Sequence, residues 1–281
     1  MQNLQKGKEM SNSEIYAGEG NASSMVHPDT GETIYNRVPQ VTWDFWLVKL
    51  LAVTVGETAA DLINTSLGLG LTKTSLIMSA FLIAALVVQF RQQRYVPWIY
   101  WLTVVLVSVV GTLITDNFID NLGWSFTPIT LMFATALAAT FAAWYAVEKT
   151  LSIHSIYTFR REAFYWLAIL FTFALGTSAG DQLAEGLGAG FLLSGLMYAA
   201  VIAVIAGLFY AGKMNGILAF WLAYIITRPM GASFGDFLSQ PTANGGLGLG
   251  TVLTSLLFFA AIGATVLYMT RSKDGVEVTT Q

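Results

Sequence analysis

The chain has 281 residues, of which 55% are hydrophobic and 11% are charged, and its formal net charge is −3. Soluble domains carry about 25% charged residues, so this composition and a mean hydropathy of +0.61 place the chain among membrane proteins. The absence of cysteine excludes disulfides and thiolate metal sites, and no basic stripe with interleaved aromatic residues supports nucleic-acid binding.

Apolar runs of about 20 residues predict an all-α integral membrane protein with eight transmembrane helices. Residues 1–40 are polar and lack the apolar core of a signal peptide, so we interpret them as a flexible or surface-lying tail. The membrane domain is expected at 41–272 and a C-terminal tail at 273–281. The predicted helices lie near 45–64, 71–90, 97–118, 125–147, 163–184, 189–211, 215–238 and 249–270.

The charged loops predict the orientation of these helices. With the N-terminus in the cytoplasm, eleven lysines and arginines fall on the cytoplasmic side and only Lys73 falls on the other side. This excess follows the positive-inside rule. It predicts a multi-pass protein of the cell membrane with both termini in the cytoplasm.

The odd-numbered predicted helices share one pattern, in which Trp precedes Gly by ten residues and Gly precedes Asp by five. The four copies are Trp46, Gly56 and Asp61; Trp101, Gly111 and Asp116; Trp166, Gly176 and Asp181; and Trp221, Gly231 and Asp236. The copies predict four tandem two-helix repeats, at about 43–95, 96–160, 161–213 and 214–272. Each unit contains two spans, so the repeats are parallel and related by an axis along the membrane normal. Because the middle spacing is 65 residues against 55 on either side, we expect two lobes rather than one ring.

A further glycine follows each Asp, and marks the start of a loop. It comes seven residues later in the first three copies, at Gly68, Gly123 and Gly188. In the fourth copy the matching Gly248 comes twelve residues later, which indicates a five-residue insertion within 240–246.

The first and fourth copies carry the most distinctive residues of the pattern. They are Trp46, Lys49, Thr54-Val55-Gly56-Glu57 and Asp61 in the first copy, and Arg228-Pro229-Met230-Gly231-Ala232 and Asp236 in the fourth. With these residues the chain resembles a bacterial integral membrane family known only as a repeat of unknown function, number 347. The resemblance covers about residues 43–270. It implies a membrane protein built from this repeat, and it implies no activity.

The repeated Asp residues are predicted to lie inside the membrane. Fifteen residues of helix rise about 22 Å, so an Asp that follows an interfacial Trp by this distance stays within the hydrocarbon core of about 30 Å. Such a carboxylate is by default a functional residue. We expect each helix to break at its glycine, so that Asp caps a new half-helix. The alternative is that Asp begins the outer loop and the glycine serves close helix packing.

Charges that are not repeated point to a binding site. Glu57 lies four residues before Asp61, on the same helix face, where the other copies carry Thr112, Thr177 and Ala232. The five predicted intramembrane acids are Glu57, Asp61, Asp116, Asp181 and Asp236, and the two bases are Lys49 and Arg228. Two acids can pair with the bases. The other three then require protons, water or a bound cation.

A hard divalent cation such as Mn²⁺, Mg²⁺ or Ca²⁺ fits this set, because carboxylate, hydroxyl and amide oxygens suit hard ions. The predicted metal and ion-binding residues are Glu57, Asp61, Asp116, Asp181 and Asp236, with neutral ligands among Thr58, Asn64, Thr112, Asn117 and Thr177. Lys49 and Arg228 are the predicted counter-charges. Gly56, Gly111, Gly176 and Gly231 are predicted hinge or packing positions.

The favoured function is therefore a secondary, proton-coupled transporter of such a cation. One alternative is a transporter or channel for a small organic solute, clamped by Arg228 and Lys49. Another is a non-catalytic membrane scaffold or sensor. The chain contains no H-E-x-x-H or G-x-S-x-G motif, so we do not expect an enzyme. The expected partners are the lipid bilayer and a small ion or solute.

Overall fold

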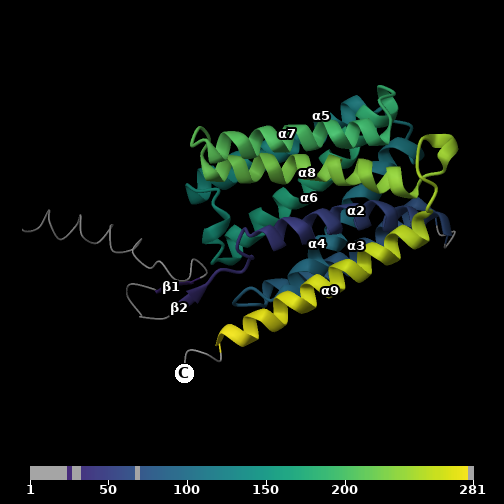
Figure 1. The fold of residues 1–281 in the computed structure, drawn as a ribbon. Helices are drawn as coiled ribbons and strands as arrows, with labels where there is room; N and C mark the ends of the chain where they lie inside the picture. The colour runs from purple at the N-terminus through teal and green to yellow at the C-terminus, as the bar shows by residue number, and fades with distance from the viewer. Residues whose placement is uncertain (1–23, 27–32, 67–69, 278–281) are drawn as a thin grey trace, which may run out of the picture.

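The computed structural model describes residues 24–26, 33–66 and 70–277. It contains an antiparallel hairpin of β1 (Ser24–Val26) and β2 (Thr33–Tyr35), which the sequence analysis did not predict. The described part also contains eight α-helices (Figure 1). They are α2 (Trp43–Asp61), α3 (Leu71–Phe90), α4 (Pro97–Asp116), α5 (Phe126–Glu148), α6 (Phe159–Asp181), α7 (Phe191–Tyr210), α8 (Gly216–Ser239) and α9 (Thr251–Glu277). The predicted tails at 1–40 and 273–281 lie partly outside the described residues, and Gly68 lies outside them.

Seven of these helices, α3 to α9, are long and apolar enough to cross a membrane. The chain is therefore a multi-pass membrane protein. The exception among the described helices is α2, whose 19 residues include Asp44, Lys49, Glu57 and Asp61. The hairpin and the C-terminal end of α9 lie at the same end of the bundle (Figure 1).

The helices form an inner ring and an outer layer. In the ring α2 packs against α4, α4 against α6, α6 against α8, and α8 against α2. Outside it α3 packs on α4, α5 on α6, α7 on α8, and α9 on α2. Between 56% and 78% of the spans of α4, α6 and α8 is buried, against 22% for α3, α5, α7 and α9. The expectation of two lobes is thus wrong: the wider middle spacing lengthens one loop and leaves the ring closed.

The repeat glycines are the points at which neighbouring inner helices cross. A Cβ added at any repeat glycine would overlap a residue of the neighbouring inner helix. In each case that residue lies three positions before the repeat glycine of its own helix. The four crossings are Gly56 on Ser108, Gly111 on Phe173, Gly176 on Arg228, and Gly231 on Val53. The same contact is used four times, and its fourth use, between α8 and α2, closes the ring.

The inner helices are continuous, so the prediction that they break at glycine is wrong. Each runs through its glycine to its Asp, and in the first three copies a π-helical turn follows, at Leu62–Ser66, Asn117–Asn121 and Gln182–Gly186. Asp116 and Asp181 have helical backbone angles and cap no helix. The chain turns instead at the next glycine, where Gly123 and Gly188 have φ of +68° and +72°, a conformation that glycine adopts without strain.

The repeated Trp residues pack inside the protein. Trp101, Trp166 and Trp221 are at most 4% exposed, so the interpretation of these three as an interfacial belt is wrong. Their indole N–H groups donate to Tyr95 Oη, Glu162 Oε1 and the Leu151 carbonyl, at 3.0, 3.4 and 2.9 Å. A buried indole requires such a partner. We call this end of the bundle the tryptophan end.

The residues just before α2 are fixed on the tryptophan end, unlike the surface-lying tail that we predicted. The Asn36 side chain donates to the Ile153 carbonyl at 2.9 Å and accepts from the Ile156 N–H at 3.1 Å. Arg37 forms an ion pair of 2.9 Å with Glu162, whose other oxygen accepts from Gln89 at 2.9 Å. This polar cluster links the N-terminal segment to α3 and α6.

The ring geometry predicts that Gly111→Ala destabilises the protein. The added Cβ would lie 2.9 Å from Phe173 Cβ and 3.2 Å from the backbone nitrogen of Ala174, atoms that cannot move without shifting α6. We expect a loss of about 1–3 kcal/mol in the free energy of unfolding, measured as a lower thermal midpoint in detergent. Gly207→Ala on α7 is the control, because its Cβ would meet nothing within 4 Å. Equal effects of the two changes would contradict a close crossing of α4 and α6 at Gly111.

Candidate functional site

The residues that follow the four repeat glycines face one another around the ring axis. They are Glu57 on α2, Thr112 on α4, Thr177 on α6 and Ala232 on α8, and all are at most 5% exposed. Their convergence follows from the crossings: when each glycine contacts the next helix, the residue after it turns towards the centre. Three of the four copies thus contribute an oxygen to the axis.

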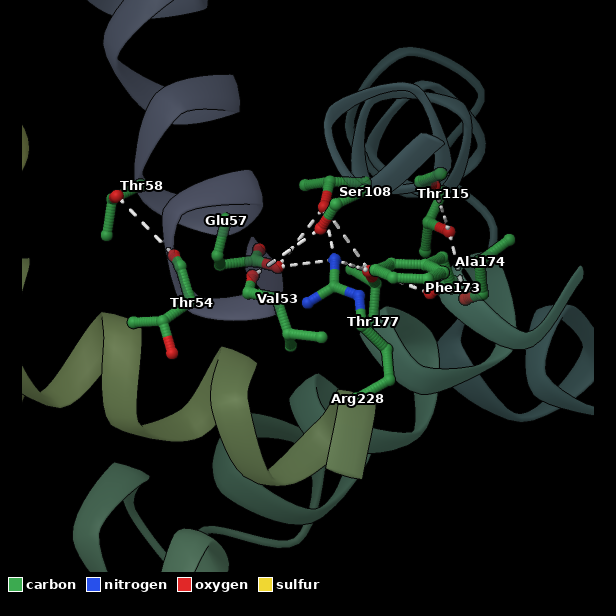
Figure 2. A network of polar contacts seen from close by, with 12 residues as sticks. Val53, Thr54, Glu57, Thr58, Ser108, Thr115, Phe173, Ala174, Thr177 and Arg228 are labelled. Carbon is green, nitrogen blue, oxygen red and sulfur yellow. Dashed lines mark hydrogen bonds and ion pairs between the residues drawn. The ribbon is translucent and has the colours of Figure 1, made fainter. Parts of the chain in front are cut away.

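Arg228 fills the centre of this layer. It lies three residues before Gly231 on α8, is fully buried, and its stem occupies the space beside Gly176. Its Nη2 donates to Glu57 Oε2 at 2.9 Å and to the hydroxyl oxygens of Thr112 and Thr177 at 2.5 and 2.7 Å (Figure 2). The Thr112 hydroxyl in turn donates to Glu57 at 3.2 Å. We call Arg228, Glu57, Thr112 and Thr177 the axial network; it joins all four inner helices.

The guanidinium of Arg228 keeps unused hydrogen-bonding capacity. Its Nε and Nη1 are buried, and neither has a hydrogen-bond partner within the described part of the chain. Its Cζ lies 5.4 Å from the centre of the Phe173 ring, a cation–π contact that offsets part of the burial of charge. These two nitrogens can therefore still donate to a bound water or ligand.

Arg228 forms an ion pair with one of the predicted acids, Glu57, whereas Lys49 interacts with Tyr224. Fully buried Lys49 donates from Nζ to the Tyr224 carbonyl at 2.6 Å and lies 4.0 Å from the centre of the Tyr224 ring. No carboxylate of residues 33–64 or 70–271 forms an ion pair with it. The reason is register: Lys49 lies two helical turns before Glu57, nearer to the tryptophan end than any of the predicted acids.

The four repeat aspartates form a second layer around the same axis. Asp61, Asp116, Asp181 and Asp236 lie four residues after the axial positions, so they are one turn further from the tryptophan end on the same helix faces. Asp236 is 7% exposed, and the other three are partly buried. Asp116 and Asp236 each interact electrostatically with Glu57, Asp61 and Asp181. We call these four residues the aspartate layer.

The five acids do not form a ready-made metal cage. Within the described ranges, no three His, Asp or Glu side chains lie close enough together to hold one metal ion. The aspartates come one from each helix, so the ring spreads them around the axis. Binding of a cation by these residues therefore stays a prediction.

Two of the predicted neutral ligands are engaged away from the axis. Asn117 donates to Ser75 Oγ and to the Leu113 carbonyl, both at 2.7 Å, and so ties α4 to α3. The Thr58 hydroxyl accepts from Ser255 on α9 at 2.9 Å. Both residues serve packing between inner and outer helices.

Sequence analysis missed a third polar layer, near the tryptophan end. The hydroxyl oxygens of buried Tyr100 and Tyr165 are 2.5 Å apart, and the equivalent positions of the other copies hold Phe45 and Phe220. All four precede their repeat glycine by eleven residues. An alignment of the copies at the glycine would have found this layer, since it places both tyrosines in one register.

Comparison with known proteins identifies the repeat. A family model described as Repeat of Unknown Function (DUF347) matches four stretches, residues 45–95, 99–150, 164–214 and 219–274. Each stretch contains one inner helix and the outer helix that follows it. No curated protein and no solved structure matches the chain.

The axial network predicts strong coupling between Glu57 and Arg228. Glu57→Gln leaves the guanidinium buried without its charged partner, so we expect a loss of about 3 kcal/mol in the free energy of unfolding. The double variant Glu57→Gln/Arg228→Met removes both charges and should recover most of that loss. Thermal unfolding in detergent measures the stability of the single and the double variant, and Glu185→Gln at an exposed position is the control. Additive effects of the two substitutions would contradict a coupled pair.

Proposed function

Because the chain belongs to the family described as Repeat of Unknown Function (DUF347), whose description assigns no activity, we propose a function from the site itself. The protein is a secondary membrane transporter that exchanges a hard divalent cation, such as Mn²⁺, for protons. The observation that carries this proposal is the axial network, which closes the ring axis directly beside a layer of four aspartates.

The proposed topology has eight spans, α2 included, with both termini in the cytoplasm. Although α2 contains four charged residues, it packs against α4, α8 and α9, and its Lys49 and Glu57 are buried. The loops and helix ends at the tryptophan end carry Arg91, Arg94, Lys149, Arg160, Arg161 and Lys213, and the only base in the described loops and helix ends of the opposite end is Lys73. The tryptophan end is therefore the cytoplasmic end.

The two layers have different roles in this proposal. The aspartate layer attracts cations, because several carboxylates around one axis create a negative potential. Arg228 stops a cation at the next turn of the ring, as a fixed positive charge excludes cations from other membrane pores. The axis is thus accessible to a cation from one side and closed towards the other.

Protonation supplies the coupling. The carboxylates of the site can hold either protons or a cation, because a metal ligand must give up its proton. Protons and the cation therefore compete for the same side chains, and this competition couples their movements.

The absence of a three-ligand cluster from the described residues fits a hydrated ion. Mg²⁺-like cations lose water reluctantly, and proteins often bind them through one or two carboxylates with water completing the coordination. Carboxylates spread around an axis suit such a partly hydrated ion better than a bare one.

One observation favours a second candidate, a transporter of small organic anions. The unpartnered Nε and Nη1 of Arg228 lie on different edges of the guanidinium, and each keeps an N–H donor that an oxygen of an organic anion can accept. In that case the aspartate layer would carry only the coupling protons.

Uptake by proteoliposomes tests the proposal. The full chain, reconstituted with a pH gradient, should accumulate Mn²⁺ and should stop when a protonophore collapses the gradient. We expect Glu57→Gln and Asp236→Asn to reduce uptake at least about tenfold, equal to about 1.4 kcal/mol in the barrier. Asp44→Asn, a carboxylate-to-amide change in the first turn of α2, should transport like the wild type.

The other outcomes are also informative. Mn²⁺ uptake that survives Glu57→Gln would contradict the role of the axial pair. No metal uptake, together with gradient-driven uptake of carboxylate solutes that Arg228→Met abolishes, would establish the second candidate. No transport of either class would favour a scaffold or sensor.

A further inference from the structure

A pocket of about 710 Å³ lies at the tryptophan end, outside the ring axis. Its walls are the N-terminal end of α2, the N-terminal end of α8 and the C-terminal end of α7, and residues 151–154 cover part of it. Trp46, Ile205, Phe209 and Phe220 supply much of its apolar lining. Phe220 precedes Gly231 by eleven residues, so the pocket is three helical turns from the axial network.

The polar side chains that line the pocket are already in use. Thr42 Oγ1 accepts from the Phe45 N–H at 3.4 Å, Ser152 Oγ from the His154 N–H at 3.3 Å, and Asn215 Oδ1 from the Ile217 N–H at 2.9 Å. Each caps the start of a helix. Partial burial lowers the pKa of His154 below its ordinary value, so this side chain is neutral at pH 7. The pocket therefore presents no charge, and an apolar ligand suits it best.

The face of α7 that points away from the pocket is an exposed apolar surface. Side chains along this helix that are 38–61% exposed are Leu192, Leu193, Leu196, Met197, Val201, Val204 and Leu208. In a membrane-spanning helix such a surface contacts lipid. At the rim Trp43 and Tyr210 are 72% and 86% exposed, and these residue types favour the level of the lipid headgroups.

The equivalent position in the first half of the chain is closed. A shift of 120 residues superposes the first repeat pair on the second, and it relates Phe209 to Gln89 and Thr42 to Glu162. There Glu162 accepts hydrogen bonds from Gln89 and Arg37, and Phe90 packs on Phe159 with ring centres 4.6 Å apart. The pocket is thus a difference between the two halves and not a by-product of the repeat architecture.

We propose that this pocket binds one acyl chain of a membrane phospholipid, with the headgroup at the level of Trp43 and Tyr210. Protein interiors contain few voids larger than a water molecule, and the surrounding bilayer supplies a hydrocarbon chain at this depth. The inference does not depend on the proposed transport function.

Native mass spectrometry of the full chain tests the site. The protein is purified in mild detergent and incubated with palmitoyl-oleoyl phosphatidylglycerol or phosphatidylethanolamine. The wild type should retain one phospholipid per chain. Ala206→Trp and Ala223→Trp fill the pocket from α7 and from α8, and each should lower the retained fraction at least about tenfold. Ala203→Trp, at an exposed position of α7, should retain lipid like the wild type.

Lipid retention is compared only among variants whose thermal midpoint in detergent matches that of Ala203→Trp. Because the two pocket variants change different helices, one of them can still test the site if the other misfolds. Retention of lipid by a folded pocket variant at the wild-type level would overturn the proposal. Loss of lipid from Ala203→Trp to the same extent as from the pocket variants would also overturn it. A wild type that retains only detergent, or that binds only a second copy of the chain, would do the same.

Discussion

The close crossing of neighbouring inner helices at each repeat glycine is the contact on which the rest of the structure depends. A glycine has no Cβ, so the backbones of two helices can approach closely there, as small residues allow in membranes. Four identical crossings require that the helices return on themselves, and Gly231 on Val53 completes the circle. The ring in turn directs the residue after each glycine to the axis, and the residue four positions later to the next layer.

Chemistry enters where the copies differ at equivalent positions. The residues after the glycines are Glu57, Thr112, Thr177 and Ala232, and the small alanine belongs to the copy whose Arg228 crosses the axis. A fourfold set of identical acids at this layer would be costly to bury. One acid, one base and two hydroxyls instead satisfy part of one another's hydrogen-bonding capacity. The aspartates one turn away keep the symmetry of the repeat.

The sequence predicted the helices and the repeat, because each rests on local composition or on spacing along the chain. It named Arg228 as a counter-charge but did not identify Glu57 as its partner. It did not predict ring closure, because spacing between copies says nothing about which faces cross. The environment of Lys49 was missed for a related reason: its partner Tyr224 lies in the fourth copy, and a carbonyl partner leaves no trace in the sequence. The aspartates were expected to cap half-helices, but π-helical turns let the inner helices continue past them.

The polar cluster of Arg37, Gln89 and Glu162 restricts how the ring can move. It ties the segment before α2 to α3 and α6, and Asn36 adds two hydrogen bonds to the loop between α5 and α6. Opposite sides of the ring are therefore joined at the tryptophan end. A displacement of α2 relative to α6 that keeps these bonds intact must therefore be small at the tryptophan end.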